Sequence, residues 1–257
     1  MSIIKKGLAS IFGIGGTKVD TVLVNNNVSP GDIVDCRVNI YGGEVSQYID
    51  KVILRLDTNY KKELDDSKVN IETTIQEFIV KIDKTVNPNE NISIPFSFKL
   101  DYNCPISKGN SRTVLKTRLD IENAVDSSDG DVLNVVPSKY MQNIFDAIKE
   151  IGFRVRDIET IDSSKKINKR GFVQEFEYDP TTAFRGRLDE LEVVFNTDDN
   201  GIKLYLQVDR KVRCFASLIS EALSLDESFL LVYFKNSELE NISYIKDKIY
   251  NLINSHS

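Results

Sequence analysis

The chain has 257 residues, of which 41% are hydrophobic and 28% charged, a composition typical of an ordinary globular protein. Its 33 lysines and arginines stand against 39 aspartates and glutamates, a formal net charge of -6. This balance argues against a nucleic-acid-binding protein, because such proteins present a basic face. No apolar run approaches the roughly 20 residues needed to span a bilayer. The length favours two domains.

The first part of the chain, up to about residue 136, has the pattern of an antiparallel β-sandwich. Apolar and polar residues alternate over 18–24 and 33–40, with the turn Pro30-Gly31 between them. Pro95 lies in a third alternating run and cannot donate a ladder hydrogen bond, so we expect that run at a sheet edge. Turn signals recur at the spacing of a sandwich. The further strands are predicted over residues 48–56, 69–82, 92–98, 114–121 and 132–136.

The residue pair Pro137-Ser138 marks the predicted boundary between an N-terminal domain, 1–136, and a C-terminal β-rich domain, 137–257. Ser138 is a predicted N-cap for a linking helix over about 138–151, and Gly152 ends that helix. An Asn200-Gly201 turn indicates a β-hairpin. Strands are predicted over 153–161, 172–178, 188–195, 202–208 and 229–234, and terminal helices over 215–223 and 239–254.

Several motifs together resemble the bacterial sporulation-control protein family. They are Lys18-Val-Asp-Thr, Gly42-Gly43-Glu44-Val45, Pro95-Phe-Ser-Phe98, Leu119-Asp-Ile-Glu-Asn-Ala-Val-Asp126 and the specific block Phe184-Arg-Gly-Arg-Leu-Asp-Glu-Leu-Glu192. The resemblance runs from about residue 5 to about residue 227. It implies a mainly β fold with two arrestin-like β-sandwich domains and short C-terminal helices. It also implies a regulatory role in sporulation, with no catalytic residue or cofactor to carry over.

The number and positions of the histidines and cysteines limit which catalytic, metal-binding and disulfide sites the chain can form. The sole histidine, His256, is the penultimate residue, so the sequence predicts neither a Ser-His-Asp triad nor a His-based zinc site. Cys36, Cys104 and Cys214 are far apart and odd in number, which is unlike a disulfide framework and indicates reduced thiols in a cytoplasmic protein. We therefore expect no catalytic residue, no metal and no cofactor.

Two motifs only approach known binding loops. The glycine-rich segment 13–18 has Thr17 before Lys18 and a strand after it, whereas a phosphate-binding loop needs the reverse order and a following helix. Asp126, Asp129 and Asp131 offer oxygen ligands for Ca²⁺ but lack the spacing of a calcium loop. We interpret the glycine-rich segment as a flexible entry to a strand and the three aspartates as part of a solvated turn. The pair Asp198-Asp199 receives the same turn interpretation.

A basic loop stands out on this acidic chain. It contains Lys165, Lys166, Lys169 and Arg170. Such a loop could dock an acidic partner or anionic lipid, although a solvated hairpin tip is the favoured interpretation.

A second charged group contains Arg185 and Arg187, followed by Asp189, Glu190 and Glu192. In a strand, the two arginines and Asp189 would share one face, and the two glutamates the other. Paired carboxylates serve glycosidases, but the favoured interpretation is an ion-pair ladder. We expect both arginines to pair with carboxylates across a strand or domain interface.

The last predicted helix carries a narrow apolar seam, formed by Ile242, Ile245, Ile249 and Leu252. Docking of this seam on the chain's own C-terminal domain is favoured. Self-association stays open as the alternative, and we expect a homodimer if the seam is free.

These features together predict a non-enzymatic cytoplasmic regulator or scaffold in the control of sporulation. It would bind other proteins, not nucleic acid, by edge-strand addition or groove docking. One alternative is a carboxylate-based sandwich carbohydrate-active enzyme, which needs a deep cleft with two carboxyls about 5–10 Å apart. The other is a membrane-surface adaptor.

Overall fold

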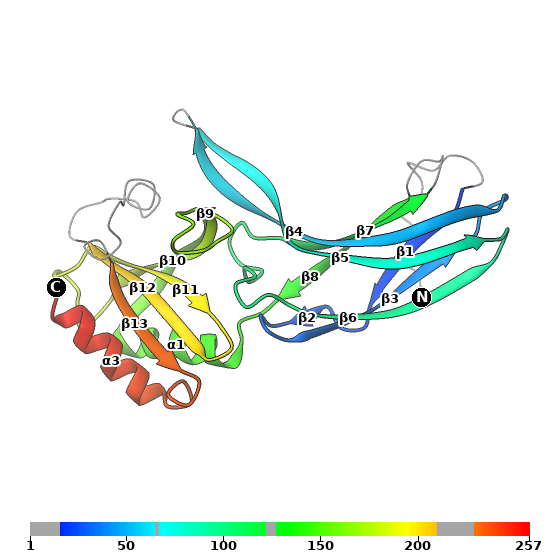
Figure 1. The fold of residues 1–257 in the computed structure, drawn as a ribbon. Coiled ribbons are helices and arrows are strands. Elements are labelled where there is room, and N and C mark those ends of the chain that lie inside the picture. The colour runs from blue at the N-terminus through cyan, green and yellow to red at the C-terminus, as the bar shows by residue number, and fades with distance from the viewer. Residues whose placement is uncertain (1–15, 65–66, 122–126, 210–228) are drawn as a thin grey trace.

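The computed structural model describes residues 16–64, 67–121, 127–209 and 229–257. These residues form thirteen strands and two helices, so the predicted mainly β class is confirmed. Figure 1 shows two lobes side by side, an N-terminal lobe made of β1–β8 and a C-terminal lobe made of β9–β13 with α1 and α3.

The N-terminal lobe packs a small sheet against a larger one. The small sheet has the order β1 (Lys18–Leu23), β3 (Ile33–Tyr41), β6 (Asn91–Lys99), so the strand that contains Pro95 lies at an edge, as predicted. In β3 every second residue is buried, which is the period of a strand with one face on a core. The larger sheet contains β2 (Asn27–Val28), β4 (Gln47–Leu64), β5 (Ser67–Val86), β7 (Thr113–Ile121) and β8 (Ser128–Val135).

The thiols of this lobe behave as the sequence predicts. Cys36 and Cys104 are free and buried. Burial raises the pKa of Cys36 to about 11 and that of Cys104 to about 12. Since the thiolate is the reactive form, both are inert packing residues at neutral pH. Cys214 lies outside the described residues.

Strands β4 and β5 are much longer than predicted, at 18 and 20 residues. Their distal half leaves the sandwich as an arm, which Figure 1 shows projecting from the N-terminal lobe. The pairing shifts register between Leu56 and Asp57, and such a bulge bends a strand. Asp57 is buried at this bend, where it accepts hydrogen bonds from Arg55 and Thr74. The sequence analysis predicted a strand over 69–82 but ended the preceding strand at residue 56, because the polar run 57–64 does not alternate.

The C-terminal lobe continues the larger sheet, which passes from β4 to β9 through the parallel pair Lys61–Ile161, and helices cover this part of it. Neighbouring strands follow chain order: β9 (Phe153–Asp162), β10 (Phe172–Pro180), β11 (Glu190–Thr197), β12 (Gly201–Asp209) and β13 (Leu230–Lys235). Helices α1 (Lys139–Ile151) and α3 (Ile242–Asn254) lie on one face of it (Figure 1). Within the described ranges the covering layer is therefore a helix pair and not a second sheet, so the sandwich arrangement describes the N-terminal lobe.

Helix α1 has the predicted caps. The Ser138 side chain accepts a hydrogen bond from the Met141 amide, and Gly152 ends the helix in the left-handed conformation with φ of 105°. A Cβ at Gly152 would lie 1.8 Å from the Thr182 hydroxyl oxygen, so glycine is required there. Helix α3 begins later than predicted, because Asn241 supplies its N-cap.

Two sequence predictions fall outside the described residues, wholly for the helix over 215–223 and by half for the glycine-rich segment 13–18, of which residues 16–18 are described. Neither described helix is long and apolar enough to cross a membrane.

The two lobes meet at the loop between β6 and β7. Gln174 of β10 holds the main chain of this loop: its side-chain oxygen accepts from the Ile106 amide at 2.9 Å, and its nitrogen donates to the Ile106 carbonyl at 3.0 Å. Asn110 pairs in the same two-way manner with the main chain of Thr160, with distances of 2.7 and 3.3 Å. Such side chains replace the ladder partners that loop residues lack.

We predict that Gln174→Leu lowers the free energy of unfolding by about 1–3 kcal/mol, because the main-chain groups of the buried Ile106 lose their partner. Chemical denaturation measures the effect. The matched control is Gln142→Leu, at an exposed glutamine bonded only to Asp146, with an expected change within about 0.5 kcal/mol. Equal effects of the two substitutions would contradict the prediction.

Candidate functional site

The basic loop divides into a structural part and an exposed part. Arg170 forms a two-pronged ion pair with Asp101 of the N-terminal lobe, with one Nη–Oδ distance of 2.8 Å. Lys165, Lys166 and Lys169 are exposed. Arg170 therefore joins the lobes, and only the three lysines stay candidates for contact with a partner.

The arginines of the specific block do not lie in a strand, as the sequence analysis had assumed. Gly186, with φ of 79°, turns the chain between them, and β11 begins only at Glu190. Arg187 donates to the Asn254 side chain at 3.2 Å and to the Ser257 hydroxyl at 2.7 Å. Within the described residues neither Arg185 nor Arg187 pairs with a carboxylate, so the predicted ladder does not form there. Arg187 instead holds the C-terminal end of α3.

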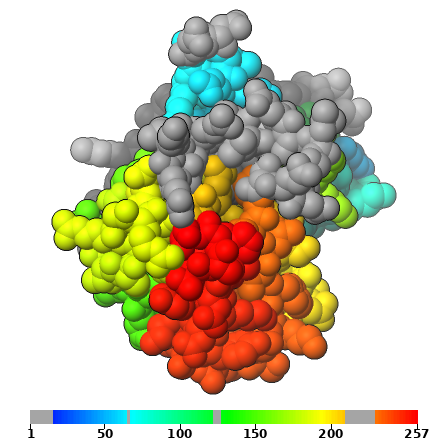
Figure 2. Space-filling view, turned by 90° about the vertical axis from the view of Figure 1, so that its left-hand side faces the viewer, coloured from blue at the N-terminus to red at the C-terminus, as the bar shows by residue number. Residues whose placement is uncertain are grey.

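The apolar seam of the last helix is docked within the chain. Ile245 and Ile249 are fully buried where α3 packs on α1, and Ile242 and Leu252 are half-buried. Figure 2 shows α3, in orange and red, on the surface of the C-terminal lobe with its outer side exposed. The homodimer expectation requires an exposed seam, and in the described residues the seam is covered by the chain itself.

The aspartates interpreted as a turn lie partly in a strand. Asp129 and Asp131 belong to β8, and the Asp129 carboxylate accepts from the Thr21 amide at 2.8 Å. Burial, with Asp129 alongside, raises the pKa of Asp131 to about 7. Asp126 lies outside the described residues. At the hairpin turn, Asp198 accepts from the amides of Asn200 and Gly201, as the turn interpretation predicts.

A carboxylate cluster lies on the sheet face opposite the helices. Glu175, Glu177 and Glu192 place carboxylate oxygens within 4.8 Å of one another. Strand period and pairing bring them together, because Glu177 is opposite Glu192 and Glu175 is two residues along the same face. The sequence analysis missed the β10 pair, although the alternation of residues 173–177 carries the signal.

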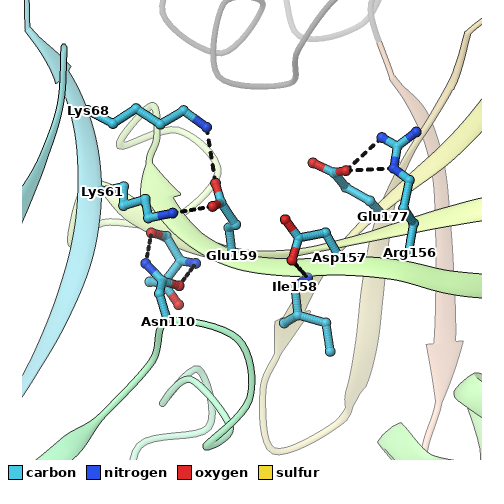
Figure 3. A network of polar contacts seen from close by, with 9 residues as sticks. Lys61, Lys68, Asn110, Arg156, Asp157, Ile158, Glu159 and Glu177 are labelled. Atoms are coloured by element: carbon cyan, nitrogen blue, oxygen red, sulfur yellow. Dashed lines mark hydrogen bonds and ion pairs between the residues drawn. The ribbon is translucent and has the colours of Figure 1, made fainter.

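Some of the carboxylates in and around the cluster have cationic partners. Arg156 binds Glu177 at 2.6 Å and Glu190 at 2.5 Å, and Figure 3 shows the first of these pairs. Glu159 receives ion pairs from Lys61 and Lys68 of the arm, which outweigh the effect of burial and lower the pKa of Glu159 (Figure 3).

Glu175 is different, because burial, reinforced by the neighbouring Glu192, raises its pKa to about 9.

The cluster has the oxygen ligands of a site for Ca²⁺ or Mg²⁺. The Arg156 guanidinium nevertheless forms an ion pair with Glu177, and burial, with Glu192 alongside, raises the pKa of Glu175 to about 9. Glu175 and Glu192 are also buried, so the pair does not face an open sugar-binding cleft. The cluster is an internal charge network in the described part of the chain.

A groove with a volume of about 730 Å³ lies between α1 and β9. We call it the α1/β9 groove. Its floor and walls are mostly apolar and come from α1, from β9 and β10, and from the lobe-joining loop. The apolar lining residues are Ile106, Pro137, Phe145, Phe153, Val155, Ile158, Phe176 and Tyr178.

The rim of the groove is mainly basic. Lys108, Lys149 and Arg154 line it, with Asp146 as the single acid among the described lining residues. Arg154 is bonded to Asp179 at 3.3 Å, whereas the two lysines have no ion-pair partner among the described residues. Sequence reasoning missed this groove, since Lys108 and Lys149 come from different lobes and only the fold joins them.

We predict that stability depends on pH through Glu175. Its folded-state pKa of about 9 lies above the ordinary 4.5, so its contribution is full below the ordinary value and is lost as the pH rises toward 9. Glu175→Gln removes this loss and stabilises the chain at pH 8 by about 5 kcal/mol, because pH 8 lies about 3.5 units above the ordinary pKa and each unit is worth about 1.4 kcal/mol. Urea unfolding from pH 5 to 9 measures it.

The control is Glu44→Gln, at an exposed glutamate of the N-terminal lobe that does not act on Glu175, so the pH dependence should stay in place. A Glu175→Gln chain with the original pH slope would show that Glu175 is ionised in the folded state.

Comparison with known proteins covers nearly the whole chain. The family described as SpoOM protein matches residues 4–212. The sporulation-control protein spo0M of Bacillus subtilis (strain 168) is 33% identical over 258 residues, which is 100% of both chains. The crystal structure of Spo0M from Bacillus subtilis matches with a TM-score of 0.89 and 32% identity, over 95% of this chain and 100% of that one. The family resemblance seen in the sequence is confirmed, and the chain belongs to the SpoOM protein family.

Proposed function

We propose that this chain is a cytoplasmic, non-enzymatic regulator in the control of sporulation and that it acts by binding other proteins. The observation that carries the proposal is the end-to-end likeness to the sporulation-control protein of Bacillus subtilis, in both sequence and fold. Since a fold hosts many functions, the pathway rests on that relative and not on the β architecture.

Action by surface contact is supported by the kinds of group present. The sole histidine stands next to the C-terminus, and the α1/β9 groove has one acid among its described lining residues, where a glycosidase needs two. A hollow with an apolar floor and a charged rim is typical of a binding site. The free, buried thiols Cys36 and Cys104 support a reducing compartment.

The test is deletion of the gene for this chain in its own organism, followed by a count of heat-resistant spores. We expect the spore count to change at least tenfold, and expression of the intact chain to restore it. Expression of the Gln174→Leu chain, in which the contact between the lobes is weakened, should restore the spore count less well than expression of the intact chain. An unchanged spore count after deletion would contradict the proposal.

A further inference from the structure

We propose that Glu175, Glu177 and Glu192 form a binding site for one divalent cation that prefers oxygen ligands, Ca²⁺ or Mg²⁺. The site lies on the face of the C-terminal sheet opposite the helices. The inference goes beyond the proposed function and does not depend on the sporulation role, because it concerns only the chemistry of the cluster.

The first argument is the spacing of the carboxylate oxygens. Glu177 lies opposite Glu192 in the pairing of β10 with β11, and Glu175 is two residues along the same face. One oxygen from each residue lies within 4.8 Å of the other two. Two ligands of one ion stand at most two metal–oxygen distances apart, which is about 5 Å for Ca²⁺ and about 4 Å for Mg²⁺. A single Ca²⁺ ion can therefore contact all three side chains, whereas Mg²⁺ needs them closer together.

The second argument is a buried oxygen without a partner. Glu175 is only 2% exposed, and its Oε1 accepts no hydrogen bond in the described part of the chain. Buried polar atoms nearly always have a partner, so such an exception points to a ligand. A proton on this carboxyl would remove its charge but would still leave Oε1 without a contact. A cation supplies both the missing charge and the missing contact.

The third argument is the charge around Glu175. After burial, which is the largest cause, four further carboxylates raise the pKa of Glu175: those of Glu192, Glu177, Glu159 and Glu190. All four therefore act on it with the same sign. Because burial limits screening by water, this gathering of acids attracts a divalent cation more strongly than an exposed cluster does.

Arg156 leaves room for the cation. Its Nε and Nη2 atoms donate to the same oxygen of Glu177, Oε2, at 3.1 and 2.6 Å, and Figure 3 shows the other oxygen turned away from Arg156. Arg156 also pairs with Glu190, so its charge is shared between two carboxylates. Glu177 therefore keeps Oε1 for the ion. The Glu177 side chain is 20% exposed, which gives the ion an entry from solvent.

A neutral oxygen stands beside the cluster. Gln207 of β12 lies directly opposite Glu192 in the sheet and is buried. Ca²⁺ takes six to eight oxygen ligands in flexible geometry, among them carboxylates, amide carbonyls and water. Mg²⁺ demands a strict octahedron and keeps several waters, which a buried cluster accommodates less well. The surroundings therefore favour Ca²⁺ over Mg²⁺.

The test uses the full chain, stripped of metal with a chelator and then dialysed. Thermal unfolding is measured at pH 8, where protons compete less for the carboxylates, with about 1 mM Ca²⁺, Mg²⁺ or, at equal ionic strength, Na⁺. For a Kd of about 10 µM we expect Ca²⁺ to raise the Tm by about 5–10 °C, with a smaller rise for Mg²⁺ and less than about 1 °C for Na⁺. Isothermal titration calorimetry should give one Ca²⁺ per chain. No rise in Tm with either divalent ion would overturn the site.

The variant Glu175→Gln removes one charge at nearly constant shape and should reduce the rise in Tm with Ca²⁺ to less than about 1 °C. In chelator this variant is expected to be more stable than the intact chain at pH 8, so a lost response is not a lost fold.

The matched control is Asp129→Asn, in the carboxylate pair Asp129–Asp131 of β8. Its amide oxygen can still accept the hydrogen bond from the Thr21 amide, and the response to Ca²⁺ should persist. A response that survives Glu175→Gln, or one that is lost in Asp129→Asn alone, would place the ion elsewhere and overturn the proposal.

Discussion

The need to satisfy main-chain groups in the loop between β6 and β7 organises the contact between the lobes. A loop packed between two sheets has amides and carbonyls that neither sheet can pair, and an unpaired buried group costs about 1–3 kcal/mol. Gln174, Asn110 and Asn103 meet this need with two-way amide contacts. Because each of these contacts spans the two lobes, the lobes are held in one arrangement, and the loop becomes an end wall of the α1/β9 groove.

The sheet of the C-terminal lobe separates two chemistries by strand alternation alone. Facing the helices, β10 presents Phe172, Phe176 and Tyr178, while its other face presents Glu175 and Glu177. Burial on the acidic face gives an internal charge network, and the apolar face leaves a groove where α1 does not fully cover β9.

Local signals predicted local structure well. Alternation marked β3, and the residues Ser138 and Gly152 marked both ends of α1, because caps and period depend on neighbours within a few residues. The same approach failed around Arg185 and Arg187, where one glycine with positive φ converts an expected strand into a turn. It also missed the distal half of β4, residues 57–64, whose polar run does not alternate and which is extended by pairing with β5.

The sequence by itself determined the mainly β class and the family, since both depend on residue type and order along the chain. Only the tertiary structure decided which charges are neighbours. Lys108 and Lys149 are 41 positions apart by number and line one groove, and burial together with Glu192 raises the pKa of Glu175 to about 9. The physical reason is that electrostatic interaction depends on distance and solvent exposure, and both are set when distant segments pack.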